Sequence, residues 1–208
     1  MYTQQIERIQ SKLHQLREAD SEFSLFGSQT HKYQMAPVWS TEEVARFEEA
    51  WKIKLPEEYK AFLLHVGSGG AGPYYGLVRP DDGVYIDLDY PSELNNVSGE
   101  FPYTEAWNFE RSWDEDSLGE EDWAEQERFY FSTDKSAGLL AISNFGCGIT
   151  INLVVNGQSY GEIWVDDRSN DNGIYPDHYF ENEKRLTFLD WYETWLDRSM
   201  EELEEEEM

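Results

Sequence analysis

A short glycine-rich segment, Gly67–Gly72, divides this chain into two unlike parts. Before it, apolar residues recur at helical spacing, and after it come short segments rich in Val and Ile. Glycines at the end of a helical pattern stop the helix and prevent its continuation. The sequence therefore predicts helices before this segment and short strands after it.

The part before residue 67 contains a series of predicted helices. The first has one apolar stripe, formed by Ile6, Ile9, Leu13 and Leu16. Residues 21–38 are expected to form a loop. The next helix begins at Ser40, which forms a capping box with Glu43, and a further helix begins after Pro56. The expected buried residues of these last two helices are Val44, Phe47, Trp51, Tyr59, Phe62, Leu63 and Val66.

Short strands are predicted after the glycine-rich segment. The alternation of Gly83–Leu88 favours a strand, and Leu139–Ile142, Gly148–Val155 and Tyr160–Val165 are rich in Ile and Val. Asn156-Gly157 lies between the last two segments and is typical of a tight hairpin turn, because both residues tolerate positive φ. We expect these last two segments to pair as a hairpin.

A last helix is predicted near the C-terminal end, where Thr187 is followed three residues later by Asp190. Its expected buried stripe consists of Phe188, Leu189, Tyr192, Trp195 and Leu196. The tail Glu201–Glu207 holds six Glu and one Leu. Like charges at i,i+4 disfavour a helix, so we expect this end to fray.

The charge balance is the strongest compositional feature. Sixteen Lys and Arg oppose 43 Asp and Glu, which gives a formal net charge of −27 over 208 residues. Such a field repels nucleic acids and anionic membranes, and it attracts basic partners. The alternative is that the acidity only keeps the protein in solution. Aromatic residues make up 15% of the chain, which is enough apolar area for a folded core.

Two motifs that could indicate ligand binding are better interpreted as structural turns. A phosphate loop at Gly67–Gly72 would follow a helix, lacks the Gly-Lys-Ser/Thr ending and lies in a very acidic chain. The segment Asp166–Gly173 resembles a calcium loop, but Arg168 and Tyr179 occupy its first and twelfth positions. We interpret the two segments as turns. Paired carboxylates could suggest glycoside hydrolysis, but among 43 acidic residues some pair lies at any chosen spacing, so such pairs are not a specific signal.

The only cysteine is Cys147, so no intrachain disulfide can form, and a reducing cytoplasm fits this composition. No histidine is placed beside it by the sequence, and we expect it to be a small buried hydrophobe. Residues Met1–Arg17 lack the apolar core of a signal peptide, and no segment resembles a membrane span. No Cys or His spacing predicts a metal site, and no cofactor is expected.

An acidic stretch within Glu105–Arg128 is the candidate binding surface. Here Trp107, Trp113 and Trp123 alternate with carboxylates, and aromatic anchors next to acceptors for Arg suit a surface that binds a basic protein. The alternative is a solvated segment whose tryptophans pack into the core; the segment is expected to be partly helical or an insertion loop. The candidate partner-binding residues are Trp113, Asp114, Glu115, Asp116, Glu120, Glu121, Asp122 and Glu125.

Several motifs together resemble the SUKH superfamily, which includes fungal cell-wall-synthesis regulators and bacterial immunity proteins. Leu55–Leu64 reads Leu-Pro-x-x-Tyr-x-x-Phe-Leu-Leu after Trp51 and before the glycine-rich turn. The other matching segments are Leu140–Gly148, Leu153–Gly157, Gly161–Trp164 and Phe188–Leu196. The resemblance extends over about Ser40 to Arg198.

The resemblance implies an α+β fold with a mixed or antiparallel sheet flanked by helices, in agreement with the predicted element order. It implies binding to a protein and no catalysis. We expect an appendage at 1–38, a SUKH-like domain at 39–200 and an acidic tail at 201–208. The leading hypothesis is a cytoplasmic immunity protein that neutralises a basic, nuclease-type toxin. The alternatives are a regulatory scaffold like the fungal members and, from a third class, a carboxylate-dependent hydrolase.

Overall fold

The computed structural model describes residues 2–109, 120–178 and 185–206. The α-helices are α1 (Thr3–Ala19), α2 (Ser28–His31), α3 (Thr41–Trp51), α4 (Glu57–His65), α5 (Glu120–Tyr130) and α6 (Phe188–Glu206). The strands are β1 (Leu139–Gly146), β2 (Ile149–Val154), β3 (Ile163–Asp167) and β4 (Gly173–Pro176), and two 3-10 turns are η1 (Thr133–Lys135) and η2 (Arg168–Asn170). The predicted α+β class is confirmed.

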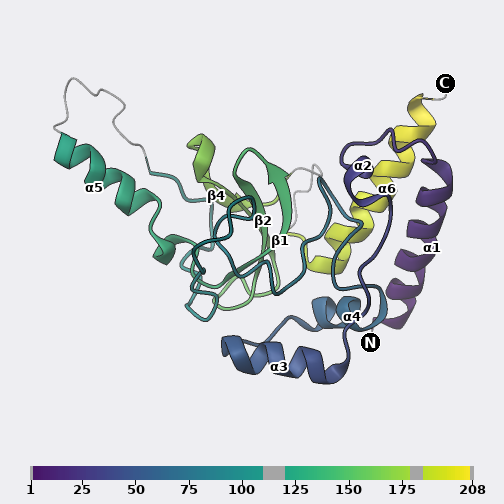
Figure 1. Ribbon diagram of the computed structural model, residues 1–208, viewed down its shortest axis with the longest axis horizontal. Coiled ribbons are helices and arrows are strands. Elements are labelled where there is room, and N and C mark those ends of the chain that lie inside the picture. Colours follow the sequence, from purple (N-terminus) through teal and green to yellow (C-terminus); the bar gives the residue numbers. More distant parts are fainter. Residues whose placement is uncertain (1, 110–119, 179–184, 207–208) are drawn as a thin grey trace.

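The four strands form one antiparallel sheet in the order β1-β2-β3-β4. Figure 1 shows α1, α4 and α6 on one side of this sheet and α5 on the other. One face of the sheet contributes Ile142, Ile151 and Val165 to the main core, whereas Trp164 and Ile174 belong to a smaller cluster. The two clusters explain why nearly every residue of the central strands is buried.

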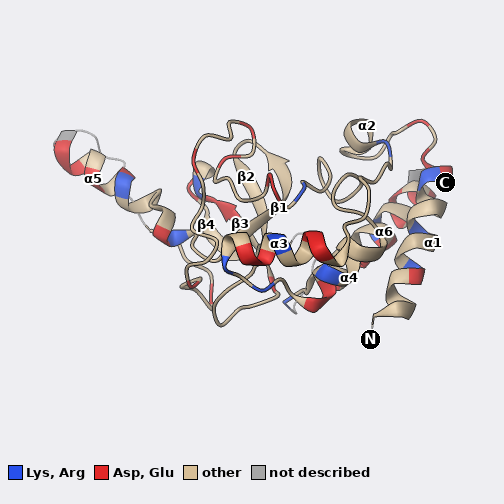
Figure 2. Ribbon diagram, turned by 60° about the horizontal axis from the view of Figure 1, so that its bottom comes forward, with Lys and Arg blue, Asp and Glu red and all other residues tan. Residues whose placement is uncertain are grey.

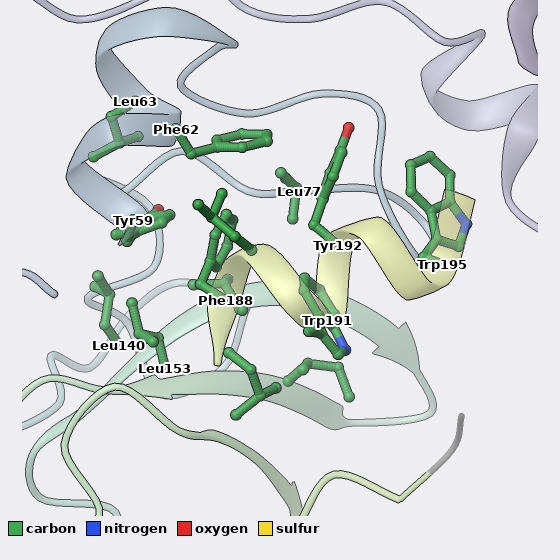
Figure 3. Packing of buried hydrophobic residues seen from close by; sticks show 14 of the residues in the cluster. Tyr59, Phe62, Leu63, Leu77, Leu140, Leu153, Phe188, Trp191, Tyr192 and Trp195 are labelled. Atoms are coloured by element: carbon green, nitrogen blue, oxygen red, sulfur yellow. The ribbon is translucent and has the colours of Figure 1, made fainter. Parts of the chain in front are cut away.

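Helix α6 occupies the centre of the main core (Figure 3). Its Phe188 ring lies 4.6 Å from Tyr59 and 5.0 Å from Phe62 of α4, measured between centroids. Two of its buried polar atoms have partners, because the Trp191 indole donates to Asp177 at 2.7 Å and the Tyr192 hydroxyl donates to a backbone carbonyl at 2.9 Å. The aromatic stripe predicted for the last helix is therefore the seam between α4 and the sheet.

Two helix starts show how local and distant groups cap a helix. At α3 the predicted capping box is confirmed, because Ser40 accepts from the Glu43 N–H while the Glu43 carboxylate accepts from the Ser40 N–H. At α6 the cap comes from another helix: the Glu58 carboxylate accepts from the Leu189 N–H at 3.3 Å. The Thr187 hydroxyl is buried without a hydrogen-bond partner, so it is not the capping group.

The glycine-rich segment is a structural turn, as predicted. Helix α4 ends at His65, and Gly70 then pairs with both Met35 and Leu77. Gly70 has φ of +107°, and a Cβ there would lie 2.2 Å from the Gln34 carbonyl oxygen. Only glycine allows this close approach of two backbones.

The strand predicted at Gly83–Leu88 is wrong. This segment forms turns and bends, with one isolated bridge between Tyr85 and Leu94. Its apolar alternation reflects a buried Val84 and half-buried neighbours in an irregular loop. The loop predicted at 21–38 also contains the short helix α2, and Trp51 is only half-buried against the core.

The tight hairpin turn lies one connection earlier than predicted. Strands β2 and β3 do pair, but their connection spans 155–162, and β3 begins at Ile163. The two-residue turn is Cys147-Gly148, between β1 and β2, where both residues have positive φ of 54° and 74°. This is the conformation of a type I′ hairpin turn. Cys147 is exposed there, so its predicted burial is wrong.

The predicted fraying of the acidic tail is also wrong, because α6 continues to Glu206. Met200 and Leu203 remain packed against the main core, and this packing outweighs the repulsion between neighbouring glutamates. Helix α1 lies alongside α6, and its predicted stripe is buried in the same core. The boundary at 38/39 stays a prediction.

Glu193 links these two helices and provides a test of their docking. Its carboxylate accepts from Arg8 and Lys12 of α1 at 2.9 Å each. Partial burial raises the pKa of Glu193, but the hydrogen bonds and positive charges of Arg8 and Lys12 outweigh burial and lower it from 4.5 to about 2. A lowered pKa means that the stabilisation is present above about pH 5 and is lost as the pH falls toward 2.

We expect Glu193→Gln to lower the free energy of unfolding by about 1–2 kcal/mol at pH 7. The difference from the wild type should shrink between about pH 5 and pH 2. Urea denaturation at pH 7 and at pH 3 measures both quantities. Glu201→Gln, an exposed glutamate of the same helix, is the matched control and should change neither.

Candidate partner-binding site

Helix α5 projects from the side of the sheet opposite to α1, α4 and α6 (Figure 1). Figure 2 shows acidic residues on it and on several other elements, including α3 and α6. The carboxylates of Glu121, Asp122 and Glu125 are exposed on α5, and Trp123 is half-buried. Helix α5 thus presents several exposed hydrogen-bond acceptors.

The predicted binding residues fall into two groups. Trp113, Asp114, Glu115 and Asp116 lie outside the described residues. Glu120 is the first residue of α5, and the three remaining carboxylates follow it on the same helix. The binding role of all eight residues stays a prediction.

Trp107 belongs to the base of α5 and is packed in an aromatic stack. Its ring centroid lies 5.2 Å from that of Tyr103 and 5.6 Å from that of Tyr130, with interplanar angles of 14° and 29°. Its backbone pairs with Ile174 of β4, and the Lys135 ammonium lies 5.4 Å from its ring centroid. For Trp107, the interpretation as a packed aromatic is therefore the correct one.

Tyr130 anchors the C-terminal end of α5. Its side chain is fully buried, and its hydroxyl donates to Asn108 at 2.8 Å. Asn108 in turn donates to the Asp171 carbonyl at 2.7 Å, beyond η2. These bonds fix the base of α5 to the loop that follows β3.

Arg168 is the residue of this site that the sequence did not indicate. Its guanidinium is buried and donates to the carbonyls of Tyr130 and Ser132 at 3.0 and 3.1 Å, and it pairs with Asp166 at 2.6 Å. Burial lowers the pKa of Arg168, but the charge of Asp166 and hydrogen bonding to it outweigh burial and raise it. A cation at the C-terminal end of a helix also complements the helix dipole.

The segment that resembles a calcium loop is a self-satisfied polar turn, as predicted. The buried carboxylate of Asp167 accepts from Asn170 at 2.7 Å, from Asn172 at 2.8 Å and from the Tyr175 hydroxyl at 3.1 Å. These side chains occupy the oxygens that a cation would need. Within the described ranges, no group of three or more His, Cys, Asp or Glu side chains is arranged to hold a metal ion.

His31 has the most strongly perturbed histidine environment, and its surroundings are structural. Burial lowers its pKa to about 4, while the charge of Asp20 acts in the opposite direction. Its Nδ1 accepts from the Tyr33 N–H at 3.1 Å, and its ring meets Trp195 edge-on at 5.9 Å. This environment keeps the imidazole neutral inside the core.

No helix in the described part of the chain is long and apolar enough to cross a membrane.

Most of this chain matches the model of a known protein family. The model of the SMI1 / KNR4 family (SUKH-1) matches residues 39–189, so the chain belongs to this family. No curated protein and no solved structure matches the chain. The predicted membership of the SUKH superfamily is confirmed, and at the level of the family it fits an immunity role without catalysis. Helix α1 and the part of α6 that follows Leu189 lie outside the matched range.

Arg168→Met tests the anchoring of α5. The substitution leaves the Asp166 carboxylate, which is only 14% exposed, without its cation, and we expect a loss of about 3 kcal/mol in the free energy of unfolding. Amide hydrogen exchange in 121–130 should become faster because the carbonyls at the end of α5 lose their donor. Arg128→Gln, an exposed arginine on α5, is the control. Unchanged exchange in Arg168→Met would show that the anchor lies elsewhere.

Proposed function

We propose that this chain is a non-enzymatic immunity protein that binds a basic, nuclease-type bacterial toxin and neutralises it. Membership of the SMI1 / KNR4 family supports an immunity role at family level. The net charge of −27 supports the chemical class of the partner. A nuclease cleft is basic because its substrate is a polyanion, and a carboxylate-rich surface is complementary to such a cleft.

The observation that carries this proposal is the acidic helix α5, held away from the body by a buried base. Its carboxylates Glu121, Asp122 and Glu125 are exposed, while Tyr130 and Arg168 fix its orientation. A rigid mount lowers the entropy lost on binding, because the helix needs no further ordering. In the proposed complex, α5 lies over the toxin's basic cleft and blocks access of the nucleic acid.

Growth of bacteria that express the toxin domain encoded next to this chain's gene tests the neutralisation. Co-expression of the chain should restore growth, and mixing the two purified proteins should abolish nucleic acid cleavage. If the chain is present in excess and cleavage continues at its full rate, the proposed function is wrong. A gene neighbourhood without any toxin domain would also contradict it.

Charge neutralisation on α5 gives a kinetic prediction. The triple variant Glu121→Gln/Asp122→Asn/Glu125→Gln should bind the toxin domain with an association rate about three- to tenfold lower at low salt. The difference should disappear toward about 1 M salt, where charges are screened within about 3 Å. Surface plasmon resonance across a salt series measures both effects.

The matched control is Glu201→Gln/Glu204→Gln/Glu205→Gln. These glutamates are exposed near the C-terminal end of α6, which lies at the opposite end of the molecule from α5 (Figure 1). The control makes the same change in net charge. An equal loss of association rate in both variants would mean that only the overall charge matters, and that α5 is not the binding site.

A further inference from the structure

A small cavity lies at the C-terminal end of α5, beside the residues that anchor this helix. Its volume is about 190 Å³, which is less than the roughly 300–1,000 Å³ of typical small-molecule pockets. The lining comes from the 86–89 loop, from Phe131, from β1, β2 and the turn between them, and from the end of β3 with η2. A cavity of this size has room for one long side chain of a partner.

The floor of the cavity is the face of the sheet that points away from the main core. Asn144 lies opposite Thr150, and Thr150 lies opposite Asp166, so these three side chains share one face. The neighbouring Ile151 and Val165 point to the other face and belong to the main core. The cavity is therefore on the side of the sheet from which α5 projects (Figure 1).

Apolar side chains form one wall of the cavity. Phe131, which directly follows α5, is 41% exposed, and Ile86 and Leu88 are half-buried. All three line the cavity. Such a wall suits the aliphatic stem of a long basic side chain, whose charged end then lies among polar groups.

The polar groups of the cavity favour a cation. Three carboxylates and one guanidinium line it, which leaves an excess of two negative charges. Asp166 uses both oxygens to accept from Arg168, at 2.8 and 2.6 Å. Asp87 and Asp89 are exposed and use only Oδ1: Asp87 accepts from backbone N–H groups of its own turn, and Asp89 accepts from Asn144 at 2.7 Å. Among the described residues, no donor bonds to the Oδ2 atom of either aspartate, so two acceptors are open to a ligand.

An arginine side chain matches both the wall and the acceptors. Its planar guanidinium stacks on aromatic rings such as that of Phe131 and presents several N–H donors to carboxylates. A lysine ammonium is a compact and strongly hydrated charge, and it lacks the flat surface that packs against a ring. The shape and the charge of the cavity therefore favour arginine.

We propose that this cavity receives an arginine side chain of the basic partner and anchors it at the end of α5. The inference rests on the proposed function, and it adds a recessed contact to the exposed carboxylates of the helix. Arg168 holds the carbonyls of Tyr130 and Ser132 at the edge of the cavity, so the walls are ordered before a partner binds. This order lowers the entropy lost on binding.

The first test uses acetyl-arginine methylamide as the probe and the full chain as the receptor, without any toxin. In amide NMR spectra, titration should shift the side-chain signal of Asn144 and the backbone signals of Gly148 and Ser169, with saturation at a Kd on the order of 1–10 mM. Acetyl-citrulline methylamide has nearly the same shape without the charge, and it should leave these signals unchanged. Equal shifts with the two probes, or no shift at the cavity, would overturn the inference.

The variant Asp87→Asn/Asp89→Asn removes both charges and keeps the structural hydrogen bonds, because an asparagine oxygen still accepts from Asn144 and from the backbone of the turn. It should keep the wild-type unfolding temperature and bind the arginine probe at least about fivefold more weakly. Asp81→Asn/Asp82→Asn makes the same change in charge at exposed positions outside the cavity and should bind like the wild type. Equal weakening in the two variants would mean that only the overall charge attracts the probe, which contradicts a site at the cavity.

Binding to the purified toxin domain encoded next to this chain's gene separates this inference from the proposed function. Asp87→Asn/Asp89→Asn should raise the Kd for that domain about tenfold, mainly through faster dissociation, while the control variant should not. If the wild type binds the toxin domain but the cavity does not bind the arginine probe, only the cavity inference is wrong. If the wild type binds the probe but not the toxin domain, the proposed function is wrong, and with it the assignment of the arginine to a toxin.

Discussion

The packing of α6 against the sheet and α4 is the interaction on which the rest of the structure depends. Phe188, Trp191 and Tyr192 are fully buried, and they join elements that are distant in the sequence. Hydrogen bonds add to this packing, since Trp191 donates to Asp177 and Glu58 caps the start of α6. Helix α1 then docks on the outer side of α6. Because α1, α4 and α6 fill this side of the sheet, the proposed binding helix α5 projects from the other side (Figure 1).

Local patterns in the sequence predicted most of the helices and the central strands. The capping box at Ser40 and the apolar stripes of α1 and α6 are local signals, and they were sufficient. What failed depended on distant contacts. The apolar alternation in Gly83–Leu88 arises from burial in a loop, and this segment pairs with no strand of the sheet. The acidic end of α6 stays helical because Met200 and Leu203 pack against the core. The anchoring role of Arg168 could not be predicted, because its partners at Tyr130 and Ser132 are distant in the sequence.

The candidate binding surface combines exposed carboxylates with an aromatic base. The exposed carboxylates of α5 contribute to a field that acts over about a Debye length. The base of α5 is ordered by the stack of Trp107 with Tyr103 and Tyr130. A groove of about 780 Å³ also lies between α1, α3 and α4. In this groove Lys60 already neutralises the carboxylates of Glu57 and Glu48. The groove is therefore less suited to a cationic partner.

The most direct test of this account is amide hydrogen exchange of the full chain, alone and with the toxin domain encoded next to its gene. The account predicts slower exchange in the complex along 121–130, with no change on α1 and α3. Protection confined to the groove between α1, α3 and α4 would contradict it. The same measurement would then assign binding to a surface that the acidic helix does not explain.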